Sequence, residues 1–114
     1  MNKLVFALLC LLTSASSAFA WGSLMVSDDG EYFGFAVGQR GEAAAIQAAR
    51  AKCGVYCSPT FTFAKTCAAF ARDPSTYQWG WSKGATTTVA QDLALGECRK
   101  QGASACKVLA SGCD

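Results

Sequence analysis

Two stretches of similar sequence decide the fold: residues 28–37 read DDGEYFGFAV, and residues 73–82 read DPSTYQWGWS. Their first aspartates align at an offset of 45 residues, and the glycines between their paired aromatic residues align at an offset of 46. Each stretch begins with turn-forming residues and continues with alternating aromatic side chains, which is typical of a turn followed by a strand. We therefore expect the chain to contain one structural unit twice.

The similarity extends outward from these stretches into a helix and a last strand. Small residues and cysteines recur at the offset of 45 residues: Ala45 with Ala90, Ala49 with Ala94, and Cys53 with Cys98. The first half, about residues 21–66, is predicted to contain strands over 24–26, 32–37 and 60–64 and a helix over 42–52. The second half, about residues 67–114, is predicted to contain strands over 68–71, 77–82 and 107–110 and a helix that ends at Cys98. Each half thus has the order ββαβ.

The stripes of alanine on both predicted helices indicate how the layers meet. Such small side chains allow a helix to approach a sheet closely. One unit alone would leave an apolar face open, and pairing two units would bury it. We expect an α+β fold in which six mostly antiparallel strands form a sheet with both helices packed on it.

Residues 1–20 have the pattern of a secretory signal peptide. Lys3 precedes an apolar run from Leu4 to Leu12, and Ala18-Phe19-Ala20 matches the small-x-small pattern that signal peptidase accepts. We expect cleavage before Trp21, which leaves one domain over residues 21–114 and a secreted or periplasmic product. No second apolar stretch is long enough to span a membrane, so we expect no span after cleavage.

The cysteines predict disulfides. Cys10 would leave with the signal, and six of the seven cysteines would remain: Cys53, Cys57, Cys67, Cys98, Cys106 and Cys113. An even number in an exported chain favours three bridges over a thiolate metal site, and we expect no metal. Local closure favours Cys53 with Cys57 and Cys98 with Cys106. Cys67 would then pair with Cys113. When the cysteines are aligned by their order, Cys67 follows the last strand of the first half and Cys113 follows the last strand of the second. This bond is therefore expected to join the halves.

Composition argues against several classes of function. The chain has no histidine, the commonest general acid or base and transition-metal ligand, so we expect neither an enzyme nor a cofactor. Ten basic and eight acidic residues are scattered along the sequence, which gives no electrostatic support for nucleic-acid binding. A pair of catalytic carboxylates, Asp28 or Asp29 with Asp73, is conceivable, but aspartate in such turns more often bonds its own backbone.

Aromatic residues offer the best candidate binding surface. Tyr77, Trp79 and Trp81 alternate and so share one face of a strand, and Phe33 and Phe35 hold the equivalent places in the first half. If exposed, this row could stack on sugar rings or anchor a protein partner. Because a small domain needs its largest side chains inside, a core role is the more common one.

These features resemble the domain-of-unknown-function 4189 family of exported bacterial proteins. The resemblance rests on residues 28–35, the alanine-rich helix that ends in Cys53, the stretch Cys67-Ala68-Ala69-Phe70-Ala71, and Trp79-Gly80-Trp81 before a second helix that ends in Cys98. It covers nearly all of Trp21 to Cys113. The resemblance implies export, a cysteine-bearing double repeat and a bacterial source, and it offers no reaction, cofactor or catalytic residue.

Three hypotheses for function follow from the sequence. The first is a non-catalytic domain that binds another protein at the bacterial envelope or outside the cell. The second is a cell-wall or glycan binding module that uses Trp79 and Trp81. The third is a small enzyme with an unrecognised site, based on Asp28, Asp73 or a cysteine thiolate.

Overall fold

The computed structural model describes residues 20–114, except for the side chains of residues 59 and 60. The predicted signal peptide therefore lies, apart from its last residue, outside the described residues. The strands are β1 (Trp21–Ser27), β2 (Phe33–Gln39), β3 (Cys57–Ala64), β4 (Cys67–Arg72), β5 (Trp79–Gly84) and β6 (Lys107–Cys113), and the helices are α2 (Glu42–Cys53) and α3 (Thr87–Lys100). The observed order is the ββαβ order expected for each half.

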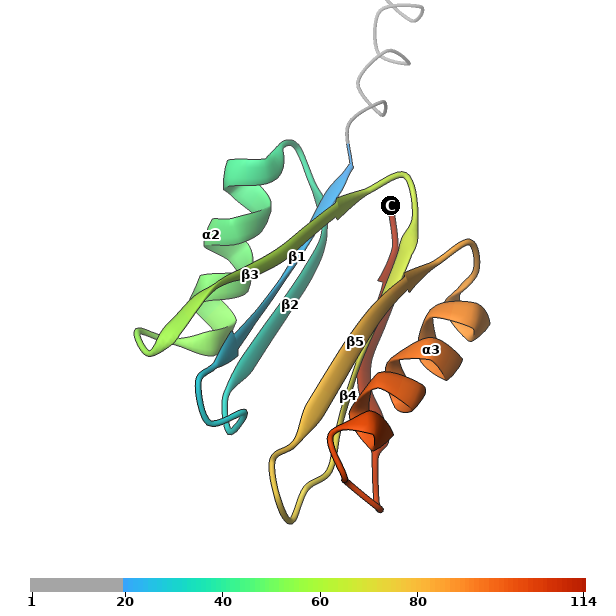
Figure 1. The fold of residues 1–114 in the computed structure, drawn as a ribbon. Helices are drawn as coiled ribbons and strands as arrows, with labels where there is room; N and C mark the ends of the chain where they lie inside the picture. Colours follow the sequence, from blue (N-terminus) through green and yellow to red (C-terminus); the bar gives the residue numbers. More distant parts are fainter. Residues whose placement is uncertain (1–19) are drawn as a thin grey trace, which may run out of the picture.

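The six strands form two sheets rather than the single sheet expected from the sequence. One antiparallel sheet has the order β2-β1-β3 and the other has the order β5-β4-β6. The sheets face each other in the middle of the molecule, and α2 and α3 lie on the outer faces (Figure 1). The α+β class, the antiparallel pairing and the disulfide stapling are as expected, whereas the merging of all strands into one sheet was wrong.

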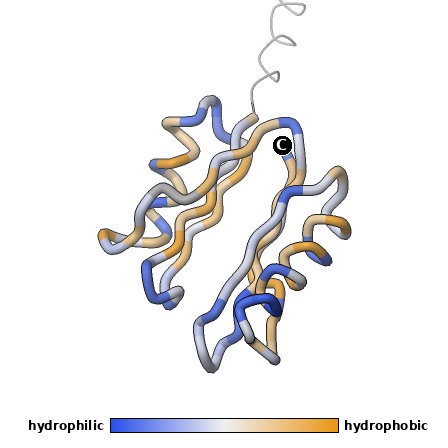
Figure 2. Tube along the Cα trace, viewed as in Figure 1, coloured by the Kyte–Doolittle hydropathy of each residue, from blue (hydrophilic) through white to orange (hydrophobic). Residues whose placement is uncertain are grey.

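The physical reason for two sheets is that both faces of each sheet are apolar. The central strands β1 and β4 are buried along nearly their whole length. Alternate side chains of a strand point to opposite faces, so one set packs against a helix and the other against the opposite sheet. Hydrophobic residues follow the strands through the centre of the molecule, and hydrophilic residues gather at the turns (Figure 2).

Glycine allows each helix to lie close to its sheet. A Cβ atom on Gly34 of β2 would collide with the carbonyl oxygen of Ala49, and one on Gly80 of β5 would collide with the backbone nitrogen of Cys98. The facing stripes are fully or almost fully buried: Ala45, Ala49 and Cys53 on α2, and Ala90, Ala94 and Cys98 on α3. The close approach expected from the alanine stripes is thus present in both halves.

Aromatic side chains fill the layer between the sheets. Leu24, Val26 and Phe70 are buried there. Six partly buried hydrophobic side chains pack against them: Phe33, Phe35, Phe61, Trp79, Trp81 and Ala110. The ring centroids of Phe33 and Phe70 are 4.7 Å apart, and those of Phe61 and Trp81 are 3.7 Å apart. Because each pair joins the two halves, aromatic stacking contributes directly to their association.

The structure contains three disulfides, Cys53–Cys57, Cys98–Cys106 and Cys67–Cys113. The sequence predicts the same three pairs, but the expectation that the last one joins the halves was wrong. Cys67 begins β4, Cys113 ends β6, and the two are direct register partners in one sheet. The alignment by cysteine order was misleading because β3 already ends at Ala64, so Cys67 belongs to the second half.

Noncovalent contacts hold the halves together at both ends of the sandwich. Arg72 Nη1 donates to the carbonyl oxygens of Gly30 and Glu31, at 3.1 and 2.7 Å. The backbone nitrogen of Gly38 donates to Asp114 Oδ1 at 2.8 Å. Within residues 20–114 no disulfide crosses between the halves, so their docking depends on these bonds, the aromatic layer and the short connection from β3 to β4.

Candidate binding site

A cavity of about 490 Å³ lies where the β1–β2 turn of the first half meets the β4–β5 loop of the second. The two segments are in direct contact, because a Cβ atom on Gly30 would collide with the carbonyl oxygen of Tyr77. Gly30 has a φ of 79°, which glycine adopts without strain. The cavity therefore exists only because the two halves dock, and residues from both of them line it.

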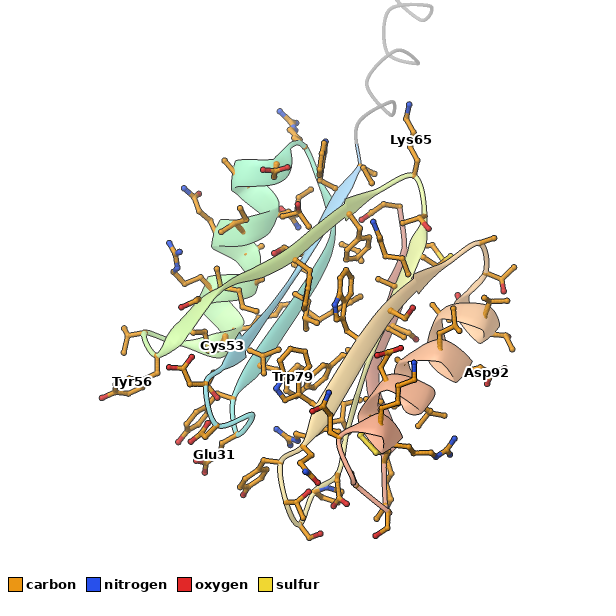
Figure 3. The ribbon with its side chains drawn as sticks, in the orientation of Figure 1. Glu31, Cys53, Tyr56, Lys65, Trp79 and Asp92 are labelled. Carbon is orange, nitrogen blue, oxygen red and sulfur yellow. A yellow bond between two sulfur atoms is a disulfide. The ribbon has the colours of Figure 1, made fainter. Side chains whose placement is uncertain are left out.

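Four aromatic side chains form the apolar part of the lining: Phe61, Tyr77, Trp79 and Trp81. One face of Trp81 is covered by Phe61, and Trp79 contacts Phe70 with ring centroids 5.8 Å apart. The indole nitrogens of both tryptophans make no hydrogen bond to the described residues. The tryptophans thus serve partly as core and partly as wall of the cavity, where Figure 3 shows Trp79 between the two sheets.

The predicted aromatic row is divided by the structure. Phe33 stacks on Phe70, and Phe35 lies 5.7 Å from Phe63 between ring centroids, so both belong to the layer between the sheets. Tyr77 lies outside the strand predicted for it, because β5 begins at Trp79 and Tyr77 has a φ of 61°. Only Tyr77, Trp79 and Trp81 of the predicted row reach the cavity.

Carboxylates, amides and one hydroxyl form the polar part of the lining: Asp28, Asp29, Glu97, Gln78, Gln101 and Thr76. Asp29 Oδ1 accepts from Ser27 Oγ at 2.7 Å and from the backbone nitrogen of Glu31 at 3.0 Å. The hydrogen bond from Glu31, followed by that from Ser27, lowers the pKa of Asp29 below its usual value, so Asp29 is charged at neutral pH. The Asp28 side chain is exposed and makes no hydrogen bond to the described residues.

Asp73 has a structural position and does not line this cavity. Its side chain is 1 % exposed, and Oδ1 accepts from the hydroxyl and the backbone nitrogen of Ser75, at 2.7 and 2.9 Å. Oδ2 accepts from the backbone nitrogen of Ala105 at 3.2 Å. These bonds, with the Ser75 hydroxyl first, lower the pKa of Asp73 to about 2. Asp73 ties the β4–β5 loop to the segment before β6, in agreement with the turn role considered for it.

The family model described as Domain of unknown function (DUF4189) matches residues 21–113. The chain belongs to this family. No curated protein and no solved structure matches it. The three disulfides of this DUF4189 domain are typical of proteins that mature in an oxidising compartment. Neither helix within residues 20–114 is long and apolar enough to cross a membrane.

A second hollow of about 390 Å³ adjoins the first cavity in this DUF4189 domain. Its lining is Ser27, Asp28, Asp29, Tyr32 and Tyr56, so Asp28 and Asp29 lie between the two hollows and contribute to both. Tyr56 is 80 % exposed and Tyr32 is 51 % exposed. Figure 3 shows Tyr56 projecting from the loop before β3.

The disulfide Cys53–Cys57 closes the loop that carries Tyr56 and the adjacent Val55, which is 88 % exposed. Sequence reasoning identified this loop only as a disulfide loop. The sequence could have indicated that Val55 and Tyr56 are exposed, because a loop of three residues between two disulfide-bonded cysteines is too short to bury two bulky side chains. We refer to the two hollows with Tyr32 and Tyr56 as the turn face of the DUF4189 domain.

Proposed function

We propose that this DUF4189 domain is an exported, non-catalytic module that binds another protein, in the periplasm or outside the cell, through its turn face. The supporting observation is that two hollows share Asp28 and Asp29 and are bordered by the exposed Tyr32 and Tyr56. Tyrosine supplies a large contact area at a low cost in conformational entropy, and it is enriched at the centres of protein interfaces.

The loop from Cys53 to Cys57 supports a protein partner in particular. Its disulfide limits the motion of Val55 and Tyr56, so less entropy is lost when a partner immobilises them. A large apolar side chain that is four-fifths exposed gains little within this chain and would gain from burial by a partner.

Export is supported by the predicted signal peptide and by the disulfides, and a non-catalytic role by the residue chemistry. The chain has no histidine, and its six cysteines after Ala20 are all joined in disulfides. A thiolate mechanism therefore has no reactive group in the oxidised domain. Asp73 is held in a loop by three donors and is separated from the cavity that Asp28 lines.

A glycan is the second candidate ligand, because Trp79 and Trp81 line the cavity together with carboxylates and amides. Stacking on a sugar needs an open ring face, and Phe61 already covers one face of Trp81. We therefore favour a protein partner.

Site-specific photocrosslinking tests the proposal. Benzoylphenylalanine is placed at position 56, at position 32, or at the control position 109, where Leu109 is 41 % exposed and lines neither hollow. We expect positions 56 and 32 to give the same crosslinked partner in cells that export the domain, and position 109 not to give it. The identified partner must then bind the purified domain. Equal capture from all three positions, or no capture from positions 56 and 32, would contradict the proposal.

A further inference from the structure

We infer that the larger cavity of the turn face receives a lysine or arginine side chain from the partner protein. This inference rests on the proposed function, since it assigns the chemistry of the partner segment that enters the cavity. The proposed function leaves the chemistry of the partner open, and this inference specifies that a basic side chain enters the cavity.

The charge of the lining is the first argument. Asp28, Asp29 and Glu97 carry carboxylates, and no Lys or Arg of the described chain contributes to the lining. Lys100 Nζ lies 3.0 Å from Glu97 Oε1 and offsets one of the three charges. The Arg72 guanidinium against Tyr77 counts against a second charge, so one net negative charge remains, and a cation is the complementary ligand.

Unused acceptors are the second argument. The two described hydrogen bonds of the Asp29 carboxylate both use Oδ1, and neither oxygen of Asp28 bonds to another residue in the described part of the chain. The lowered pKa of Asp29 keeps its carboxylate ionised at neutral pH. Oxygen atoms of both residues can thus accept hydrogen bonds from an ammonium or guanidinium group. Such charge-assisted hydrogen bonds are among the strongest in proteins.

The aromatic walls are the third argument. A cation is attracted to the face of a tryptophan or tyrosine ring, and its aliphatic stem gains from contact with apolar surface. The domain already holds one cation in this way nearby: the Arg72 guanidinium lies 5.4 Å from the centroid of Tyr77 and 5.5 Å from that of Phe33. Because Arg72 already engages the Tyr77 ring and would repel a second cation there, the inferred cation would contact the rings of Trp79 and Trp81, which also line the cavity.

Other ligands fit these groups less well. A carboxylate or phosphate would be repelled by Asp28 and Asp29, and a purely apolar side chain would strip water from them without compensation. A sugar would use the indole nitrogens of Trp79 and Trp81 but would leave the negative charge unbalanced. The test must therefore separate cation, apolar and sugar probes.

Titration of the isotopically labelled domain by nuclear magnetic resonance makes this separation. The probes are blocked pentapeptides with lysine or arginine between two pairs of glycines, and the controls carry norleucine or glutamate at the centre. The readout is the indole N–H signals of Trp79 and Trp81, with Trp21 as an internal reference, because Trp21 does not line the cavity. We expect saturable shifts for Trp79 and Trp81 with the basic peptides, at least tenfold weaker binding of norleucine, and no shift of Trp21.

Two variants test the role of charge without touching the hydrogen bonds of the turn. Asp28→Asn and Glu97→Gln should each weaken binding of the basic peptides severalfold, and raised salt should do the same. The control Asp92→Asn changes an exposed carboxylate of α3 that does not line the cavity and should leave the affinity unchanged. The indole signals themselves report whether each variant is folded.

Equal binding of norleucine and lysine peptides, or no saturable shift with either basic peptide, would overturn the inference. Tighter binding of an N-acetylglucosamine disaccharide than of the basic peptides would also overturn it and would favour the glycan candidate. If the cation fails while position 56 still captures its partner, the proposed function stands and only the inferred cation is wrong.

Discussion

Arg72 of the second half donates a hydrogen bond of 2.7 Å to the carbonyl oxygen of Glu31 in the first half. The same nitrogen also bonds the carbonyl oxygen of Gly30, so one guanidinium fixes the β1–β2 turn against the opposite sheet. The position of this turn determines where Asp28 and Asp29 lie, and hence the shape of both hollows. The docking of the halves and the candidate site therefore share one set of contacts.

Removal of the Arg72 side chain should loosen this docking. Arg72→Ala loses charge-assisted hydrogen bonds to two carbonyl groups and the contacts with Phe33 and Tyr77, and we expect a loss of about 2 kcal/mol in the free energy of unfolding. Urea unfolding measures this loss. Arg40→Ala is the control, because Arg40 is exposed in the β2–α2 loop and should change stability by less than about 0.5 kcal/mol. Equal effects of the two changes would contradict the assigned role of Arg72.

Glycine substitutions test the close packing of the helices. Gly80→Ala places a methyl group against the backbone of α3 and should destabilise the domain by about 1 to 3 kcal/mol or more. Gly96→Ala is the matched control inside α3, where a Cβ atom meets nothing within 4 Å. It should stabilise the domain by up to about 1 kcal/mol, because alanine is the better helix former. Thermal unfolding of both variants shows the direction of each stability change. Destabilisation by Gly96→Ala would show that α3 is packed differently.

Acid should weaken the domain through Asp73. Its pKa is about 2 in the folded state and below the ordinary value of 3.8, so the unfolded chain binds the proton more readily. The stabilisation from Asp73 is therefore fully present above about pH 4 to 5 and is lost as the pH falls toward 2. Asp73→Asn should be less stable at neutral pH and should show a shallower loss between pH 5 and 2. Unfolding curves across this range check it, and parallel pH profiles for wild type and variant would count against it.

The disulfides should differ in their contribution to stability. Cys67–Cys113 joins residues 46 positions apart, whereas Cys53–Cys57 joins residues four positions apart. In the chain-entropy model their removal costs about 4 and about 2 kcal/mol, respectively. Paired alanine variants of each bridge, compared by thermal unfolding, measure the difference. Peptide mapping without reduction should recover the three bridges, and a Cys53–Cys98 peptide would refute the arrangement.

Most elements of the fold could be predicted from local patterns. The helix expected over 42–52 is α2, Glu42–Cys53, and the strand expected over 107–110 is the first part of β6. The division into two sheets could not be predicted, because alternation along β1 and β4 shows that both faces are apolar but not what covers them. The sequence alignment was also wrong in pairing Asp28 with Asp73 at an offset of 45. Leu24 and Phe70 occupy equivalent buried places in the two sheets at an offset of 46. At that offset Asp73 is equivalent to Ser27.

The candidate site was only partly accessible from the sequence. Trp79 and Trp81 were identified because aromatic alternation is a local signal. Glu97 and Tyr56 were missed, since their place beside the hollows depends on how the two halves dock and on a loop closed by a disulfide. The core role weighed for Phe33 and Phe35 agrees with their stacking between the sheets.

The affinity of the purified partner for two matched variants tests the role of the turn face most directly. Calorimetry on Tyr56→Ser should show binding at least tenfold weaker than wild type, because an exposed tyrosine that anchors an interface typically contributes more than about 1.4 kcal/mol. Leu109→Ser, an exposed apolar change outside both hollows, should alter the affinity by less than about twofold. Undiminished binding by Tyr56→Ser, or an equal loss in both variants, would contradict the account.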